Sequence, residues 1–161
     1  MTDEVSRFNI ESIEDHLLEF QTDVEEINEV VSEFMRCIKE QDKDTFLQLF
    51  YHDNTPWLGK FDRESEEIAK GTNPDVVNHF GVFDISRDTF INSMVTPPRA
   101  LHFEERLTNL KIDTDGFVAS ASFDYSLLVN ESRIKGGREF WQLIKTTHGW
   151  RIVSVIHSIK F

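Results

Sequence analysis

The chain has 161 residues, of which 39% are hydrophobic, including 14 Phe and 3 Trp, so it can bury one sizeable core and disorder throughout is excluded. Its formal net charge of −12 excludes a nucleic-acid partner, because binding to phosphate backbones depends on clustered Lys and Arg. The only cysteine, Cys37, excludes an intrachain disulfide, and no apolar run approaches the ~18 residues of a membrane span, so we expect a cytoplasmic protein without a membrane partner.

Acidic residues dominate the start of the chain. The first 22 residues hold six acidic residues and a single Arg or Lys, Arg7. Such a block of like charge is typical of a solvated helix face. One or two helical turns are indicated here by the apolar residues Ile10, Ile13 and Leu17. We expect an acidic N-terminal extension over residues 1–22 and a single domain over residues 23–161.

An amphipathic helix is predicted next. Its apolar residues recur at alternating spacings of three and four, with charged residues between them: Val24, Ile27, Val31, Phe34 and Ile38. Asp42 or Asp44 can then cap a short second helix, in which Phe46 and Phe50 fall on one face. The chain therefore begins with helices.

The middle of the chain has weaker patterns. A short strand is predicted around Trp57, after the turn residues of the segment HDNTP. Residues 62–81 have no clean period, so we expect a loop with at most a helical turn near residues 65–69. Ser86 can cap a helix over residues 87–94, which a Pro-Pro pair ends.

Four extended stretches complete the chain and are separated by turn residues: 101–112, 117–129, 134–146 and 150–161. They predict an antiparallel meander. Gly136 and Gly137 lie inside the third stretch, where adjacent glycines mark a bulge or a bend, so we expect the sheet to curl. Helices followed by a curved meander predict an α+β domain whose sheet packs on segregated helices.

The last stretch is apolar on both faces. Trp150, Ile152 and Ile156 alternate with a second apolar set: Val153, Val155 and Ile159. A sheet wetted on one side shows a cleaner alternation of apolar and polar residues. We therefore expect helices or a pocket on one face and a second subunit on the other.

A row of polar residues is predicted across the four strands. Two-residue turns at 147–148, 131–132 and 114–115 would align four side chains on one face: Glu104, Tyr125, Arg138 and His157. Phe123 and Phe140 would share that face and provide aromatic walls. An apolar pocket with a few convergent polar groups is typical of a small-molecule site.

Three interpretations of this row are open. Glu104 and Arg138 can form a cross-strand ion pair, with Tyr125 and His157 as hydrogen-bonded interior groups. Alternatively, His157 accepts or donates a proton near neutral pH while Tyr125 or Arg138 stabilises an oxyanion. The third interpretation is ligand binding without chemistry.

Three segments of the chain form a recognisable set: INEVVSEFMRCI, QDKDTFLQLFYHDNTPWLG and GREFWQLIKTTHGWRIVSVIHS, which together span Ile27 to Ser158. They resemble the nuclear transport factor 2-like superfamily, near its SnoaL-like and kinase association-domain branches. The resemblance implies a cone-shaped, strongly curved, mixed or antiparallel sheet wrapped on the N-terminal helices, with one pocket between sheet and helices. It also implies homodimers that form through the outer sheet face.

The resemblance extends to function. Similar proteins include isomerases, dehydratases, epoxide hydrolases and polyketide cyclases, alongside noncatalytic binding and assembly modules, so the fold alone does not fix the chemistry. The enzymes use carboxylates or histidines inside the cone. The candidate counterparts in this chain are Asp53, Asp124 and His157, and Trp57 is expected to wall the pocket.

The function we expect is that of a SnoaL-like small-molecule-binding protein, with cofactor-independent lyase, isomerase or hydrolase activity as one option. The alternative is a noncatalytic homodimeric interaction or assembly module. His52 and Asp53 are adjacent on a turn and rarely converge on one ion, so no metal site is expected. The predicted catalytic residues are His157, Tyr125 and Arg138, and the predicted ligand-binding residues are Trp57, Glu104, Phe123, Phe140 and Asp53.

Overall fold

The computed structural model describes residues 2–97 and 101–161, with side chains from Phe20 onward. In chain order the elements are α1 (Thr2–Glu40), α2 (Lys43–Leu47), β1 (Trp57–Phe61), α3 (Arg63–Thr72), β2 (Phe83–Asp84), α4 (Arg87–Phe90), the π-helix η1 (Ile91–Val95), β3 (Phe103–Thr114), β4 (Val118–Val129), β5 (Ser132–Thr146) and β6 (Gly149–Ile159). The predicted α+β order, with helices before an antiparallel meander, is confirmed.

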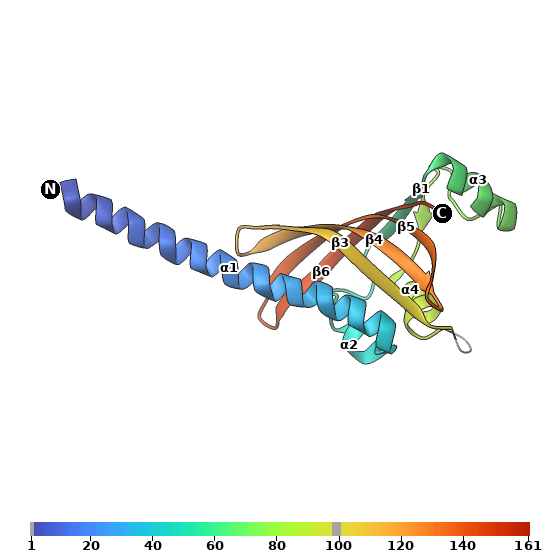
Figure 1. Cartoon of the computed structure of the whole chain (residues 1–161), viewed down its shortest axis with the longest axis horizontal. Helices are drawn as coiled ribbons and strands as arrows, with labels where there is room; N and C mark the ends of the chain where they lie inside the picture. Colours follow the sequence, from blue (N-terminus) through green and yellow to red (C-terminus); the bar gives the residue numbers. More distant parts are fainter. Residues whose placement is uncertain (1, 98–100) are drawn as a thin grey trace.

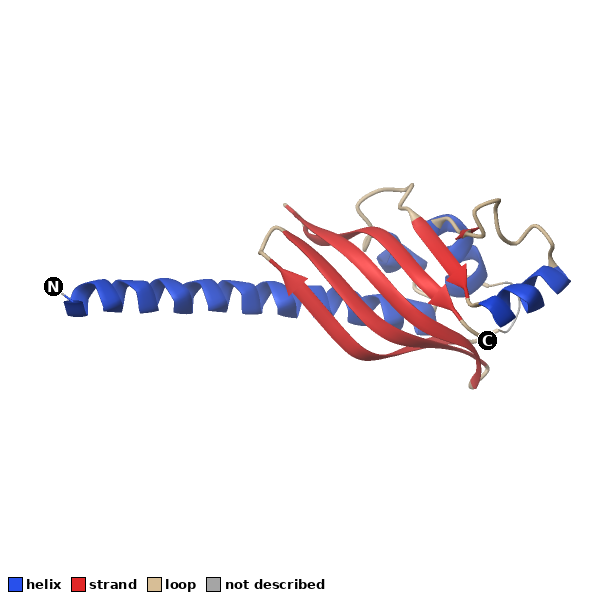
Figure 2. Ribbon diagram, turned by 90° about the horizontal axis from the view of Figure 1, so that it is seen from above, coloured by secondary structure: helices blue, strands red, loops and turns tan. Residues whose placement is uncertain are grey.

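Helix α1 is longer than its sequence pattern predicted. The apolar stripe packs as expected, since Ile27, Val31, Phe34 and Ile38 are fully buried. The helix nevertheless reaches back to Thr2 as one uninterrupted element, and its N-terminal part extends past the edge of the sheet (Figures 1 and 2). The boundary predicted after residue 22 thus lies within one helix, and the division into an extension and a domain stays a prediction.

Asp23 anchors α1 to the far end of the sheet. Its carboxylate is buried, and Oδ1 accepts hydrogen bonds from Trp150 Nε1 at 3.2 Å and from Lys145 Nζ at 2.8 Å. A buried charge needs such partners, because an unpaired carboxylate in the interior is costly. The hairpin between β5 and β6 is therefore fixed to the helix.

The predicted helix caps are confirmed. The Asp42 carboxylate accepts a hydrogen bond from the backbone N–H of Thr45 at 3.1 Å, and Ser86 Oγ accepts one from the N–H of Thr89 at 3.1 Å. Each bond satisfies a donor that the first turn of a helix leaves free. The Ser86-capped helix changes after Phe90 into the π-helix η1, a rare form that is frequent at functional sites.

The prediction of a loop over residues 62–81 is wrong. Ten of these residues form α3, which is capped by Asp62 through a 2.9 Å bond from the N–H of Ser65. Ser65 is the one buried residue of this helix, and Ile68 is 61% exposed. A helix that buries so little needs no apolar stripe, and Ile68 and Ala69 are the only apolar side chains in its sequence.

The sheet has six strands in the order β2-β1-β6-β5-β4-β3. β1 pairs with β6 in parallel and all other neighbours are antiparallel, so the sheet is mixed. It curls around the helices without closing, with α1 along its inner face (Figure 1). The core is aromatic: the Phe34 ring lies within 4.7–6.0 Å of the rings of Phe46, Trp57, Phe90 and Trp141.

The predicted register of β5 and β6 is wrong by one residue beyond its turn. Thr146 pairs with Gly149 as expected, but an extra residue in β6, Val153, shifts the ladder. His157 is consequently paired with Glu139 and not with Arg138. Because side chains alternate between faces, one inserted residue exchanges the inward and outward sets of a strand relative to its partner.

The other two predicted pairings are also wrong. The turn between β4 and β5 occupies Asn130 and Glu131, both with positive φ (47° and 71°), and Tyr125 pairs with Gly137. The turn between β3 and β4 is longer than two residues, since Thr114 pairs with Ala119, and a β-bulge between Thr108 and Lys111 shifts the ladder again. Within the turn the Asp115 carboxylate accepts two backbone N–H bonds, at 2.9 Å and 3.0 Å. Glu104 therefore pairs with Leu128 and not with Tyr125.

Gly137 allows a close approach that a larger residue would prevent. A Cβ atom at this position would overlap the backbone carbonyl of Ser158 on β6. The same carbonyl accepts a 2.8 Å hydrogen bond from the Tyr125 hydroxyl. Tyr125 on β4, Gly137 on β5 and Ser158 on β6 therefore meet at the inner face, next to the glycine pair where a bend was expected.

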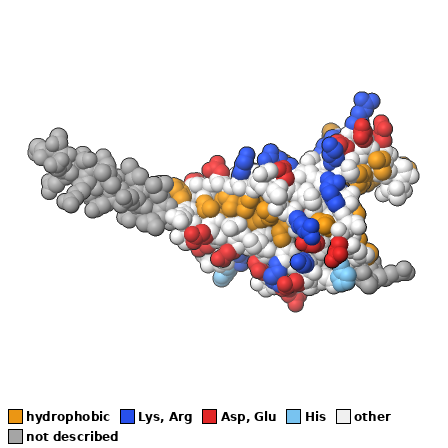
Figure 3. Space-filling model, in the orientation of Figure 1, with side chains coloured by type: hydrophobic (Ala, Val, Ile, Leu, Met, Phe, Trp, Pro, Cys, Tyr) orange, Lys and Arg blue, Asp and Glu red, His pale blue; other side chains and the backbone are white. Residues whose placement is uncertain are grey.

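The surface mixes charges of both signs. On the face seen in Figure 3, hydrophobic side chains form a band across the middle of the molecule, bordered by both acidic and basic residues. The net negative charge is therefore not gathered into one patch there. Across residues 2–97 and 101–161, none of the helices is both long and apolar enough to cross a membrane.

Candidate functional site

The predicted polar row is divided between the two faces of the sheet. Tyr125 and His157 point inward, with ring centroids 6.1 Å apart in an edge-to-face arrangement. Glu104 and Arg138 lie on the outer face, where Glu104 accepts a 3.0 Å bond from Arg106 and Arg138 lies 3.5 Å from Asp124. The alignment of all four side chains on one face is therefore wrong.

The remaining predicted ligand-binding residues are also divided. Trp57 and Phe123 are buried on the inner side, and Trp57 lines an enclosed cavity. Phe140 is 48% exposed on the outer side, with the Arg138 guanidinium 5.7 Å from its ring centroid. Asp53 is exposed and forms a 3.3 Å ion pair with the buried Arg87. Asp53 and Phe140 thus lie away from the cavity, and ligand binding by these residues stays a prediction.

Three inward-facing ionisable residues were missed by sequence reasoning: Glu105, Lys135 and Glu139. Glu105 pairs with Leu127, and Leu127 pairs with Lys135, so these side chains cross β3, β4 and β5 in one row. Glu139 follows four residues after Lys135 on the same face. Each glutamate is the sequence neighbour of a predicted residue, Glu104 or Arg138. With the correct turn lengths and bulges, the same register argument would have placed Glu105 and Glu139 on the inner face.

These side chains surround a cavity of about 30 Å³ inside the cone, together with Tyr125 and His157. Its other walls are apolar: Trp57, Phe83, Ile85, Phe90, Met94 and Leu127. Phe90 and Met94 come from α4 and η1, so the π-helix forms part of the wall. A space of this size holds a water molecule or a ligand of a few heavy atoms.

Glu105 and Glu139 form a buried carboxyl pair. They are 5% and 3% exposed. Burial raises the pKa of Glu105 well above its usual value, and the neighbouring Glu139 raises it further. Burial also raises the pKa of Glu139, against the effect of hydrogen bonds from Glu105 and from Trp141 Nε1, the latter at 2.8 Å. Two neighbouring buried carboxylates do not both ionise readily, so the pair retains a proton above the pH at which an ordinary glutamate loses it.

His157 is neutral in this site. Burial lowers its pKa to about 4, the charge of Lys135 lowers it further, and a hydrogen bond with the backbone of Leu58 opposes both effects. The imidazole lies over Gly59, where a Cβ would come within 3.1 Å of Cε1 and Nε2. Any side chain at position 59 would therefore displace the imidazole ring of His157. The remaining nitrogen, Nδ1, is buried without a hydrogen-bond partner.

Tyr125 and Lys135 complete the polar part of the cavity. Burial raises the pKa of Tyr125, and its hydroxyl already donates to the Ser158 carbonyl, so Tyr125 is a neutral, oriented phenol. Burial lowers the pKa of Lys135, while the two carboxyls raise it. The site therefore offers a proton donor, a neutral imidazole and an amine around one small space. Within the described ranges no group of three or more His, Cys, Asp or Glu residues is arranged to hold a metal ion.

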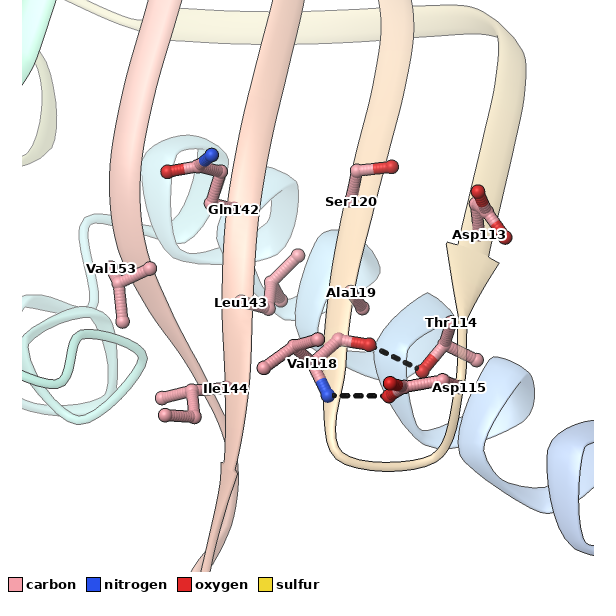
Figure 4. A pocket seen from close by; sticks show the side chains of 10 residues that line it. All are labelled: Asp113, Thr114, Asp115, Val118, Ala119, Ser120, Gln142, Leu143, Ile144 and Val153. Atoms are coloured by element: carbon pink, nitrogen blue, oxygen red, sulfur yellow. Dashed lines mark hydrogen bonds between the residues drawn. The ribbon is translucent and has the colours of Figure 1, made fainter.

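A larger hollow of about 550 Å³ lies on the outer sheet face, near the turn between β3 and β4. Figure 4 shows Ser120, Gln142 and Val153 on adjacent strands, with α1 behind the sheet. Thr114 and Asp115 bond to Val118 of the same turn, so their polar groups are already satisfied. Its lining includes no buried ionisable residue, which makes it a weaker candidate for chemistry than the inner cavity.

No protein-family model matches the chain, and no curated protein matches its sequence. Solved structures do match. A protein of unknown function from Mycobacterium tuberculosis has a TM-score of 0.63 at 17% identity, over 89% of this chain and 75% of that one. An NTF2-like protein with a cystatin-like fold from Novosphingobium aromaticivorans has a TM-score of 0.61 at 16% identity, over 88% and 84%. LinA has a TM-score of 0.63 at 11% identity, over 91% of both chains.

Proposed function

Since this chain has the cystatin-like fold of nuclear transport factor 2-like proteins, as its sequence resemblance predicted, we propose that it binds a small uncharged molecule inside the cone and moves a proton on it. The reaction class that fits is a lyase, isomerase or hydrolase reaction driven by the protein's own side chains. The acid is the carboxyl pair of Glu105 and Glu139, and the base is His157.

One observation carries this proposal. Glu105 Oε1 and His157 Nδ1 are both buried without a hydrogen-bond partner, and both residues line the same cavity. Leaving a buried polar group unpaired costs about 1–3 kcal/mol, so native proteins pair nearly all of them. Two unpaired atoms on residues that line one space indicate that a molecule with a donor and an acceptor belongs between them.

The walls define the ligand. The cavity of about 30 Å³ limits its size, and the aromatic walls disfavour a charged group. A ligand hydroxyl or carbonyl would accept the proton held by Glu105 and Glu139, while the unpaired His157 Nδ1 takes one from a neighbouring carbon or oxygen. Arg138, predicted as catalytic, lies on the outer face and has no part in this scheme.

The test is a thermal-shift titration with acetone, acetamide and propan-2-ol. Ligands of about four heavy atoms bind no tighter than about −6 kcal/mol, so millimolar concentrations are needed. At ten times the dissociation constant we expect a gain of ~1.4 kcal/mol, or about 3–5 °C in melting temperature. Glu105→Gln and His157→Gln should lose the gain.

Glu104→Gln is the matched control, because Glu104 is the outward neighbour of Glu105 and should keep the full gain. If none of the three compounds stabilises the wild type, or if Glu105→Gln and Glu104→Gln respond alike, the inner cavity is not the ligand site. One tightly held water would then explain the unpaired atoms.

A second proposal concerns the outer sheet face, which we infer is a homodimer interface. Leu58 pairs with Ile156, and Ile156 pairs with Phe140, so three exposed apolar side chains form one row across β1, β6 and β5. Val118 and Ile144, which border the larger hollow, continue the apolar surface and are also exposed. Exposed apolar surface of this extent is typical of an interface between subunits.

Phe140→Glu is expected to convert a dimer into monomers, because a carboxylate in the middle of the apolar row would be desolvated on association. Sedimentation equilibrium of the full chain measures this directly. Ile68→Glu is the matched control, since Ile68 is 61% exposed on α3, away from the sheet face. A wild-type chain that remains monomeric at high concentration would contradict the interface.

A further inference from the structure

Lys135 occupies an unusual position for a lysine. It lies in the row with Glu105 and Leu127, faces inward, and lines the enclosed cavity beside aromatic and aliphatic walls. Lys135 is partly buried there, and a lysine beside apolar walls is uncommon unless it is paired. The proposed reaction uses Glu105 and Glu139 as the acid and His157 as the base, so it gives Lys135 no role in the cavity.

Structural pairing does not account for it. Both carboxyls are close enough to raise the pKa of Lys135, yet no direct ion pair joins its amine to either of them among the described residues. Burial outweighs their effect and lowers the pKa of the amine. An amine that loses its proton more easily than usual, next to a proton-holding carboxyl pair, has the properties of a nucleophile.

We propose that Lys135 forms an imine with a small aldehyde or ketone in this cavity, an inference that rests on the proposed function and names its substrate class. The neutral Nζ adds to the carbonyl carbon, and one of its protons moves to the oxygen. The carboxyl pair then protonates the hydroxyl of this adduct, water leaves, and the nitrogen loses a proton back to the carboxylate. The balance is one amine and one carbonyl giving one imine and one water.

The neighbouring residues suit this step. The Tyr125 hydroxyl is engaged with Ser158, so it does not compete for the carbonyl oxygen. His157 is neutral, so no second cation repels the developing iminium ion. With the carbonyl carbon bonded to Lys135, the unpaired His157 Nδ1 can remove a proton from the adjacent carbon, which an iminium ion makes acidic.

The test is reductive trapping in the full-length protein. The chain is incubated with acetaldehyde and sodium borohydride at neutral pH, and the ethyl group that forms on each lysine is followed by peptide mass mapping. Borohydride is no larger than the aldehyde, so it can reach the same space. Lys111, exposed on β3, is the internal reference. A lowered pKa raises the neutral, reactive fraction of an amine, so we expect Lys135 to react faster than Lys111.

Three controls decide the result. In denaturant the two lysines should react equally, because the rate advantage comes from the folded cavity. Glu105→Gln should slow trapping at Lys135, whereas Glu104→Gln should not. If acetone stabilises the protein but Lys135 reacts no faster than Lys111, the imine is excluded while the binding site stands. If neither stabilisation nor trapping is seen, both proposals fail.

Discussion

Phe34→Ala is expected to destabilise the protein by about 3–5 kcal/mol, the largest effect of any substitution considered for this chain. Phe34 is fully buried on α1, and its ring contacts those of Phe46, Trp57, Phe90 and Trp141. Removing it leaves a cavity bordered by large rigid rings that cannot collapse inward. Since domains are stable by only about 5–15 kcal/mol, much of the margin would be lost.

Chemical denaturation measures this loss, and a melting-temperature decrease of about 8–15 °C should accompany it. Met35→Ala is the matched control: it is the next residue of α1, only partly buried, and alanine favours the helix at both positions. A similar small decrease in both variants would mean that the aromatic cluster does not hold α1 to the sheet.

The second large effect is on the pH dependence of stability. Glu105 and Glu139 have pKa values raised above the ordinary 4.5, so the folded state holds protons that the unfolded chain releases. Their stabilising contribution is complete below pH 4.5 and is lost as the pH rises through the raised values. His157 acts in the opposite sense, because its pKa is lowered from 6.5 to about 4, so stability falls as the pH decreases across that interval.

His157 is neutral in both states only above about pH 7.5, because its unfolded pKa is 6.5. It contributes equally to the wild type and to Glu105→Gln, since Glu105 does not shift its pKa, and the comparison between these two proteins isolates the carboxyl pair. From pH 6.5 to about pH 8.5 the wild type should lose stability relative to Glu105→Gln as the pH rises through the raised pKa of Glu105, because glutamine mimics the protonated acid and does not titrate. Lys135 adds to this difference, because its lowered pKa makes stability rise with pH and the loss of Glu105 in the variant lowers that pKa further.

Urea denaturation at several pH values provides this difference. Glu104→Gln should run parallel to the wild type over the same interval, because the Arg106 guanidinium lowers the pKa of Glu104 and leaves it ionised throughout. A constant difference between wild type and Glu105→Gln across the interval would show that the buried pair holds no proton.

The elements of the fold were predictable because each has a local signal. The alternating spacing of Ile27, Val31, Phe34 and Ile38 fixes the buried face of α1, and capping by Asp42 and Ser86 depends on side chains within four residues. The strands likewise follow from turn residues between extended stretches. Helix α3 was missed because it buries a single residue and so has no apolar period.

The site was only half predictable, because a face assignment depends on every turn and bulge before it. Tyr125 and His157 were placed correctly inside, but the extra residue Val153 in β6 replaced Arg138 with Glu139 as the partner of His157. Glu104 was predicted in place of Glu105 because the length of the turn between β3 and β4 and the bulge in β3 were not anticipated. Nothing local distinguishes the two glutamates, and an ionised carboxylate is normally assigned to solvent.

The central claim is that the carboxyl pair inside the cone keeps a proton at neutral pH. Carbon-13 NMR of the glutamate side-chain carboxyls, titrated across the pH range in the wild type and in Glu105→Gln, tests it directly. The account predicts one carboxyl resonance that stays in the protonated position through pH 7 and is lost in the variant. If every glutamate of the wild type has titrated by about pH 5, the cavity contains no such acid and the proposed proton transfer has no donor.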